Sequence, residues 1–264
     1  MTEVTSWLLP TDLSFREASN QESSGHHFVH LLSATCALRN LGKVRDWAIA
    51  HGHDFRIVRL YRDEPLPDTW EFDLLVLMGG PMGVHDEAQY SWLLPEKRLV
   101  GRCLADGKFA LGVCLGSQIL ADVLGARVYR NRWKEIGWFP VERCSLDGSA
   151  FSDPPPRQFF VFQWHRETFD LQPGTTHLAT SEACCIQAFE HAYALGLQFH
   201  LEVTAEGVAA LVSEWGDDID SGPYEQTARQ ILASGDHFGR CTSRLTEILD
   251  AVEKGIAYSS SLVN

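Results

Sequence analysis

The sequence of 264 residues lacks an apolar run long enough to cross a membrane, and it lacks a long block of positive charge. A membrane-spanning helix needs roughly 18 consecutive apolar residues. The formal net charge is −13, and the densest basic cluster, residues 127–134, holds only three arginines and one lysine. Nucleic acid binding calls for a broader basic surface. We therefore expect neither a membrane nor a nucleic acid as a partner.

The N-terminal region lacks the features of a targeting segment. A secretory signal starts with positive charge and continues into an apolar stretch, and a transit peptide is poor in acidic residues. Residues 1–25 are polar and contain four acidic side chains. We expect a flexible extension over residues 1–25, with an ordered surface strap as the alternative. Residues 26–264 are expected to form a single domain, with a helical C-terminal part over 204–264.

The cysteines lack paired spacing. Seven are scattered along the chain, without the pattern of a disulfide framework or of a zinc site: Cys36, Cys103, Cys114, Cys144, Cys184, Cys185 and Cys241. A reducing, cytoplasmic location is the expectation that follows. No metal and no organic cofactor is implied.

Strand-like and helix-like segments alternate over the first half of the chain. Strands are expected over residues 56–61, 73–78 and 108–113. Helices are expected over residues 43–51, 95–105 and 117–124. A further, less regular strand is expected within residues 26–38. This alternation predicts β-α-β crossovers and a parallel sheet that helices cover on both faces.

After residue 126 the sequence is rich in β-type pieces that Gly, Pro and Asp turns separate. Helical patterns return from Thr204, notably over residues 205–215 and 224–232. No internal repeat or low-complexity tract is present. A single α/β domain with a mixed sheet accounts for this organisation.

A cysteine stands between two glycines at a strand-to-helix junction, in the sequence GVCLGSQ of residues 112–118. At a sharp junction of this kind the backbone is strained, and the neighbours two residues away must be small. Gly112 and Gly116 occupy those two places. The turn would present the Cys114 sulfur to the positive end of the following helix, which favours the nucleophilic thiolate. The alternative is that Cys114 is an ordinary buried core residue.

A thiolate nucleophile needs a base, and the base needs an acid that orients it. Among eleven histidines, His200 lies in the strand-like sequence LGLQFHLEV, with Glu202 two residues further on. Residues two apart on a strand project from the same face, so Glu202 can reach the imidazole of His200. The alternative is a purely structural histidine on a strand.

Backbone N–H groups that could stabilise an oxyanion are expected at two places. One is Leu115, which directly follows Cys114, and the other is Gly80 in the sequence LMGGPMG of residues 77–83. Glycine lets a backbone approach a ligand closely, although an ordinary Gly-Gly-Pro turn is the alternative. The turn lacks the Lys and Ser/Thr of a phosphate-binding loop.

These motifs resemble the triad-type (class I) glutamine amidotransferase family. GVCLGSQ, MGGPMG and HLE carry the resemblance, together with EIGWFPVE and QWHRETFDLQPG, and it is closest to the stand-alone branch similar to the glutaminase domain of GMP synthetase. It covers roughly residues 41–202. The resemblance implies a flavodoxin-like three-layer α/β domain with a mostly parallel central sheet, a smaller antiparallel β portion and C-terminal helices. It also implies hydrolysis of the side-chain amide of glutamine.

The resemblance assigns roles to individual residues. The catalytic positions match Cys114 as nucleophile, His200 as base and Glu202 as orienting acid, and the oxyanion donors match Gly80 and Leu115. The positions that hold the substrate match Gln118, Trp164, His165 and Arg166. The expected chemistry is attack of Cys114 on the carboxamide, loss of ammonia from a γ-glutamyl thioester, and hydrolysis to glutamate.

Three functions remain open from the sequence. The first is a glutamine-hydrolysing subunit or a stand-alone amidotransferase-like enzyme. Nothing in the chain resembles a synthetase domain, and a separate synthetase partner would dock near residues 82–90 and a loop at 133–138. Trp138 is better read as a core residue. The second is a γ-glutamyl peptide hydrolase with the same triad. The third is a non-catalytic regulatory or binding module on this fold.

Overall fold

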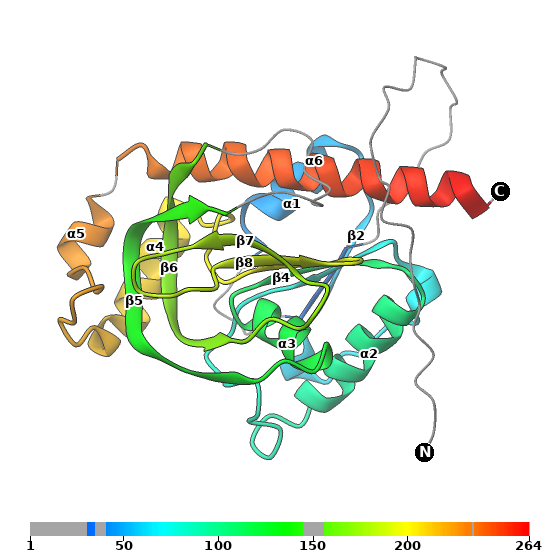
Figure 1. Ribbon diagram of the computed structural model, residues 1–264, viewed down its shortest axis with the longest axis horizontal. Coiled ribbons are helices and arrows are strands. Elements are labelled where there is room, and N and C mark those ends of the chain that lie inside the picture. Colours follow the sequence, from blue (N-terminus) through cyan, green and yellow to red (C-terminus); the bar gives the residue numbers. More distant parts are fainter. Residues whose placement is uncertain (1–30, 35–40, 145–155, 234, 264) are drawn as a thin grey trace.

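The computed structural model describes residues 31–34, 41–144, 156–233 and 235–263. The extension expected over residues 1–25 lies outside this part of the chain. The described strands form one nine-stranded sheet in the order β2-β1-β3-β4-β9-β8-β7-β5-β6 (Figure 1). The sheet has a parallel half, which holds the predicted β-α-β units, and an antiparallel half.

The parallel half contains five short strands: β1 (Leu31–Ala34), β2 (Phe55–Val58), β3 (Leu74–Leu77), β4 (Phe109–Val113) and β9 (Ala194–Leu197). The order 2-1-3-4 is that of flavodoxin-like sheets, in which ligands bind beyond the carboxyl ends of the strands. The predicted fold class is therefore confirmed. β2 ends earlier than expected because the chain turns into a 3₁₀ helix, η1 (Leu60–Arg62). A second 3₁₀ helix, η2 (Thr69–Glu71), precedes β3.

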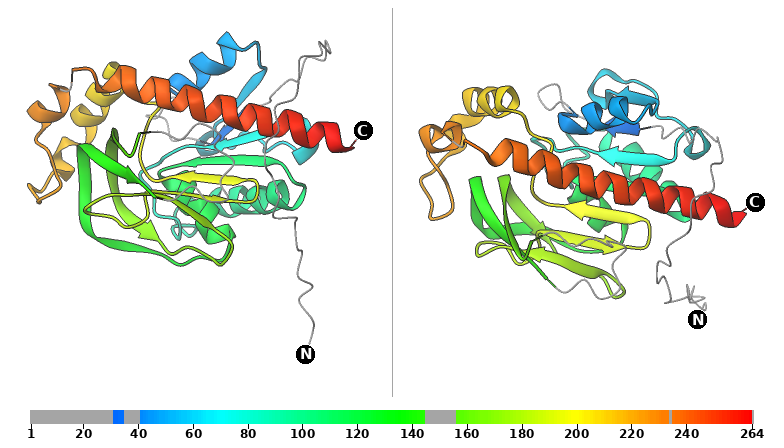
Figure 2. Two further views of the ribbon diagram at one scale, coloured as in Figure 1. Left: turned by 45° about the horizontal axis from the view of Figure 1, so that its top comes forward. Right: turned by 90° about the horizontal axis from the view of Figure 1, so that it is seen from above.

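Helices cover both faces of the parallel half (Figures 1 and 2). β3 shows how the sequence divides them: Leu74 and Val76 pack in the cluster that includes α1 (Lys43–Ala50) and α6 (His237–Val263). Leu75 and Leu77 pack in the cluster that includes α2 (Leu93–Ala105) and α3 (Leu115–Val123). A strand buried on both faces reads as a continuous apolar run, as LLVL does here. No helix within the described ranges is both long and apolar enough to cross a membrane.

The antiparallel half is built on two long strands, β5 (Val128–Arg143) and β6 (Gln158–Phe169), followed by β7 (Thr176–Thr180) and β8 (Ala188–His191). The expected loop at residues 133–138 is wrong, because these residues belong to β5. The pairing of β5 with β6 shifts register between Arg130 and Glu135, which explains why the sequence reads as two pieces. Trp138 is buried in the core, with 3% of its surface exposed.

The C-terminal part begins with α4 (Ala205–Trp215), which has the predicted bounds, and η3 (Gly216–Asp218). α5 (Ala228–Leu232) is shorter than the helix expected over residues 224–232. The reason is that Tyr224 and Gln226 bond to β5 instead: Ile136 N donates to Tyr224 O, and Gln226 N donates to Ile136 O. The helix starts only after a capping box between Thr227 and Gln230.

Candidate active site

Cys114 occupies the turn between β4 and α3, with a φ of 55°. Positive φ is costly for a residue with a Cβ atom, and the surrounding packing maintains it. A Cβ on Gly112 would lie 2.4 Å from Gly116 O, and a Cβ on Gly116 would lie 2.1 Å from Leu77 O at the end of β3. Both glycines are therefore required for the close approach of α3 to the sheet.

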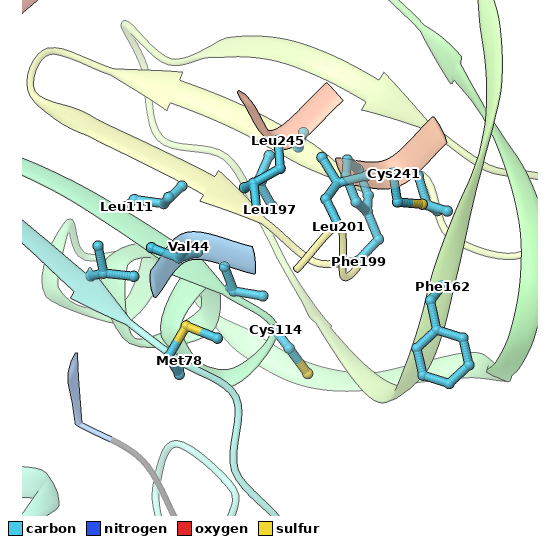
Figure 3. Packing of buried hydrophobic residues seen from close by; sticks show 14 of the residues in the cluster. Val44, Met78, Leu111, Cys114, Phe162, Leu197, Phe199, Leu201, Cys241 and Leu245 are labelled. Atoms are coloured by element: carbon cyan, nitrogen blue, oxygen red, sulfur yellow. The ribbon is translucent and has the colours of Figure 1, made fainter. Parts of the chain in front are cut away.

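The Cys114 side chain borders both the core and a cavity. Figure 3 shows it at the margin of the apolar cluster, with its sulfur pointing away from Val44 and Leu111. The residue is 5% exposed, yet it lines the cavity in front of α3. Its Sγ lies 3.8 Å from Trp164 O on β6. The sulfur is shielded from bulk solvent but accessible from this cavity.

His200 and Glu202 follow β9 and lie beside Cys114. His200 Nδ1 is 2.6 Å from Glu202 Oε1, and both side chains are buried. β9 ends at Leu197, so His200 is not within the strand as expected; it forms an isolated antiparallel bridge with Phe162 of β6. Since a carboxylate oxygen accepts, Nδ1 carries the hydrogen. The Nε2 nitrogen is then the one available for proton exchange with the sulfur.

The electrostatic surroundings keep His200 protonated. Burial alone would lower its pKa, but the negative charge of Glu202 and a hydrogen bond with Cys114 outweigh burial and raise the pKa to about 9. At neutral pH the ring is therefore an imidazolium. A positive imidazolium next to the sulfur favours the thiolate.

The start of α1 supports Glu202, a contact that the sequence did not reveal. Lys43 N donates to Glu202 O over 2.9 Å. Gly42 has a φ of 48°, and a Cβ there would lie 2.0 Å from the same carbonyl oxygen. Only glycine fits this approach, so the backbone of Glu202 is fixed by an element about 160 residues away in the chain.

The cavity has a volume of about 360 Å³, at the lower end of the range for small-molecule pockets. The expected oxyanion residues Gly80 and Leu115 both line it, and a Cβ on Gly80 would lie 3.1 Å from Leu115 Cδ2. The other expected substrate residues also line it: Gln118, Trp164, His165 and Arg166. Seven of the nine site residues expected from the sequence thus line one cavity. The other two, His200 and Glu202, are connected to it through the contact of His200 with Cys114.

Gln118 is held by a residue that the sequence did not nominate. Its Nε2 donates to Gln198 Oε1 over 3.1 Å, and Gln198 is fully buried. Gln198 directly follows β9, two residues before His200. The segment after β9 that carries His200, the expected base, therefore also orients Gln118.

The His165 ring is held in place by two contacts. Nδ1 donates to Glu167 O over 3.0 Å, and Nε2 lies 3.0 Å from Glu135 Oε2 on β5. Glu135 is 1% exposed, and it also accepts hydrogen bonds from Ser181 and Gln187. This network fixes the β6 segment that forms one wall of the cavity, which gives His165 a supporting role in that wall.

The C-terminal part supplies another wall of the cavity. Trp215 and Asp218 line it together with Lys134 of β5. Lys134 Nζ bonds to Asp218 O and, over 2.7 Å, to Asp220 Oδ2. Burial opposes the charge of Lys134, but the bond to Asp220 holds its pKa above the usual value. Trp215 Nε1 is buried and has no hydrogen-bond partner among the described residues.

The Gly-Cys-Gly turn, the His-Glu pair and the cavity beyond the parallel strands have the arrangement expected of an amidotransferase domain. The family model of class-I glutamine amidotransferases matches residues 44–210. The chain therefore belongs to the class-I glutamine amidotransferase family.

Individual relatives agree with this membership. The chain is 31% identical over 204 residues to the glutamine amidotransferase-like protein YfeJ of Salmonella typhimurium, covering 74% of this chain and 84% of that protein. A crystal structure of a glutamine amidotransferase from Thermotoga maritima superposes with a TM-score of 0.79 at 34% identity, over 86% of this chain and all of that one. The chain is also 33% identical over 139 residues to the glutamine-hydrolysing GMP synthase of Thermomicrobium roseum. That match covers 52% of this chain but only 25% of the synthase.

Proposed function

We propose that this protein hydrolyses the side-chain amide of glutamine to glutamate and ammonia, with Cys114 as the nucleophile. The observation that carries the proposal is the contact of Cys114, which lines the cavity, with the buried His200–Glu202 pair. A nucleophile, a base and a group that orients the base are the parts that this chemistry requires. The family membership supports the same reaction.

In the first half of the reaction, the Cys114 thiolate attacks the carboxamide carbon of glutamine. The carbonyl oxygen gains negative charge, and the N–H groups of Gly80 and Leu115 stabilise it; loss of one such donor typically costs about 10²–10³ in rate. The His200 imidazolium then donates its Nε2 proton to the departing nitrogen. Ammonia leaves, and a γ-glutamyl thioester remains on Cys114.

In the second half, neutral His200 accepts a proton from a water molecule that attacks the thioester carbon. The thiolate leaves, glutamate is released, and His200 is again an imidazolium. Glu202 holds the ring in the required tautomer and stabilises its positive charge in both halves. Gln118 and the wall at Trp164–Arg166 hold the amino-acid part of the substrate.

The test is to measure ammonia and glutamate formation from glutamine with the wild-type chain and with Cys114→Ser. Cys185→Ser is the matched control, because Cys185 is an exposed cysteine that does not line the cavity. We expect turnover to be abolished in Cys114→Ser and unchanged in Cys185→Ser. Equal turnover in wild type and Cys114→Ser would refute the proposal that Cys114 is the nucleophile.

A γ-glutamyl amide other than glutamine is a second candidate substrate. The lining of the cavity includes more ionisable side chains than the ammonium and carboxylate of glutamine need: Asp86, Lys134, Arg166, Glu167 and Asp218. A γ-glutamyl peptide brings additional polar groups that such a rim could bind. Side-by-side kcat/KM values for glutamine and glutathione decide between the two, and the larger value identifies the preferred substrate.

A separate synthetase is the proposed acceptor of the ammonia. The support comes from the GMP synthase relatives, in which a region similar to this chain is part of a glutamine-hydrolysing synthase. Affinity capture with the full chain, followed by measurement of glutaminase activity with the captured protein, tests this. A synthetase that raises the activity is expected, and a captured protein without any effect argues against it.

A further inference from the structure

Helix α1 packs against α6 (Figure 2). A second cluster of ionisable side chains lies where α1 ends beside the middle of α6. One ligand atom from each of His51, Asp250 and Glu253 lies within 4.8 Å of the others. His51 caps the C-terminus of α1, and the two acids stand three residues apart on α6. The catalytic residues take no part in this cluster.

The tautomer of His51 is fixed by its surroundings. Nδ1 lies 2.9 Å from Trp47 O, and because a carbonyl only accepts, Nδ1 carries the hydrogen. In the neutral ring Nε2 therefore has a lone pair, and it faces Asp250 Oδ1 at 3.5 Å. Two electron-pair donors face one another, and a cation between them resolves the repulsion. A histidine whose other nitrogen donates to a backbone carbonyl is the usual arrangement of a metal ligand.

His53 provides an independent observation. Its side chain is only 3% exposed. Neither ring nitrogen makes a hydrogen bond among the described residues, although Nε2 lies 3.3 Å from Glu253 Oε1. A buried polar group normally has a partner, because its desolvation is otherwise uncompensated. His53 is therefore placed to act as a further ligand beside Glu253.

The carboxylates of Asp250 and Glu253 are held in position, and no lysine or arginine among the described residues pairs with them. Asp250 and Glu253 occupy one face of α6, since residues three apart on a helix are neighbours. Leu249 and Val252, on the adjoining side of the same turn, are buried in the core. Trp47 Nε1 donates to Asp250 Oδ1 over 2.8 Å, which orients the carboxylate.

We propose that this cluster binds one divalent transition-metal ion of the Zn²⁺ class, ligated by His51, Asp250 and Glu253 and adjoined by His53. A mixed imidazole and carboxylate set suits Zn²⁺, Co²⁺ or Ni²⁺ better than Mg²⁺ or Ca²⁺, which prefer oxygen alone. Small side-chain movements bring the three atoms to the usual bond lengths of roughly 2.0–2.2 Å. Bound metal would cross-link α1 to α6, two elements about 200 residues apart in the chain.

The test is a titration of the full chain with Zn²⁺ alone. Calorimetry measures the binding, and the thermal unfolding temperature is measured with and without Zn²⁺. The titration is performed in Cys114→Ser as well as in wild type, because the active-site thiol is itself a zinc ligand. Asp250→Asn and exposed His51→Gln are the test variants. Glu247→Gln, on the same helix but outside the cluster, is the matched control.

We expect one Zn²⁺ per chain that survives in Cys114→Ser, with Zn²⁺ raising the unfolding temperature. Affinity should fall at least about tenfold in Asp250→Asn and in His51→Gln and stay unchanged in Glu247→Gln. Circular dichroism checks that the variants are folded. The proposal is overturned if no saturable binding occurs, or if both test variants bind Zn²⁺ as tightly as wild type. It is equally overturned if Asp250→Asn changes stability to the same extent with Zn²⁺ and with a chelator, since protonated histidine then accounts for the contact.

Discussion

Replacement of Glu202 by glutamine tests the electrostatic basis of the active site. The variant keeps the size of the side chain and an oxygen that can accept from His200 Nδ1, but it removes the negative charge. Glu202 is the strongest of the influences that raise the pKa of His200 to about 9, against the opposing effect of burial. Without that charge, the effect of burial is less fully offset, and the pKa should fall toward the ordinary value of 6.5.

The magnitude follows from the protonated fraction of His200. At about pH 7.5, a pKa of about 9 leaves nearly all of the rings charged, whereas a pKa of 6.5 leaves only about a tenth charged. Population alone therefore costs about tenfold in the rate of thioester formation. Loss of ring orientation adds to this, so we expect kcat/KM to fall about 10²–10⁴-fold in total.

The assay is the pH profile of glutamate formation, together with the rate at which iodoacetamide alkylates Cys114. Wild type should lose activity as the pH rises through about 9, where the pair formed by Cys114 and His200 loses its proton. In Glu202→Gln this limb should move toward neutral pH. Glu142→Gln, an exposed carboxylate on β5, is the control and should keep the wild-type profile. An unchanged alkaline limb in Glu202→Gln would refute the reasoning.

Three further predictions concern packing, positioning and pH. Gly116→Ala should lower the free energy of unfolding by about 3 kcal/mol in a urea titration, since its Cβ would meet Leu77 O at 2.1 Å. The control Gly239→Ala has open space around the added Cβ and should not destabilise the protein. Equal urea midpoints for the two variants would contradict the close approach of α3 to the sheet. Gln198→Met should raise KM for glutamine about five- to tenfold with a smaller effect on kcat, because Gln118 loses its acceptor; an effect on kcat alone would argue against this role. Burial raises the pKa of Glu96 on α2 to about 8, so the protonated form stabilises the fold at low pH and this contribution is lost as the pH rises from about 4.5 through about 8. In wild type the free energy of unfolding should therefore fall by up to about 5 kcal/mol over that pH range, and in Glu96→Gln this fall should be absent. Parallel curves of unfolding free energy against pH for wild type and variant would contradict the raised pKa of Glu96.

The geometry of the proposed catalytic residues could be predicted where the information is local in the chain. Gly112 and Gly116 lie within two residues of Cys114, and the need for small side chains at such a turn is written into the sequence. The spacing of His200 and Glu202 likewise predicts their contact, and the structure places Nδ1 and Oε1 2.6 Å apart. The parallel half of the sheet was predictable for the same reason, since each β-α-β unit carries its own alternation.

Contacts between distant segments could not be predicted. Lys134 meets Asp218 and Asp220 across more than 80 residues, and nothing in either segment indicates the other. The apparent helix at residues 224–232 is interrupted because Gln226 finds hydrogen-bond partners on β5. Local propensity is a weak guide where a tertiary contact competes for the same backbone groups.

The direction of the His165 side chain also could not be predicted from the sequence. Its place in QWHRE indicated a residue at the substrate, and the residue does line the cavity. The ring itself binds Glu135, which stands 30 positions earlier on the paired strand. The direction of a side chain on β5 and β6 depends on the register shift between Arg130 and Glu135, which no sequence pattern revealed.

Covalent labelling with an electrophilic diazo-ketone analogue of glutamine tests the central claim most directly. We predict that the analogue attaches to Cys114 in a ratio of one per chain, that ammonia release from glutamine stops in proportion to labelling, and that Cys114→Ser is neither labelled nor active. Labelling of another cysteine with Cys114 unmodified, or undiminished glutamine turnover after Cys114 is fully labelled, would contradict the account.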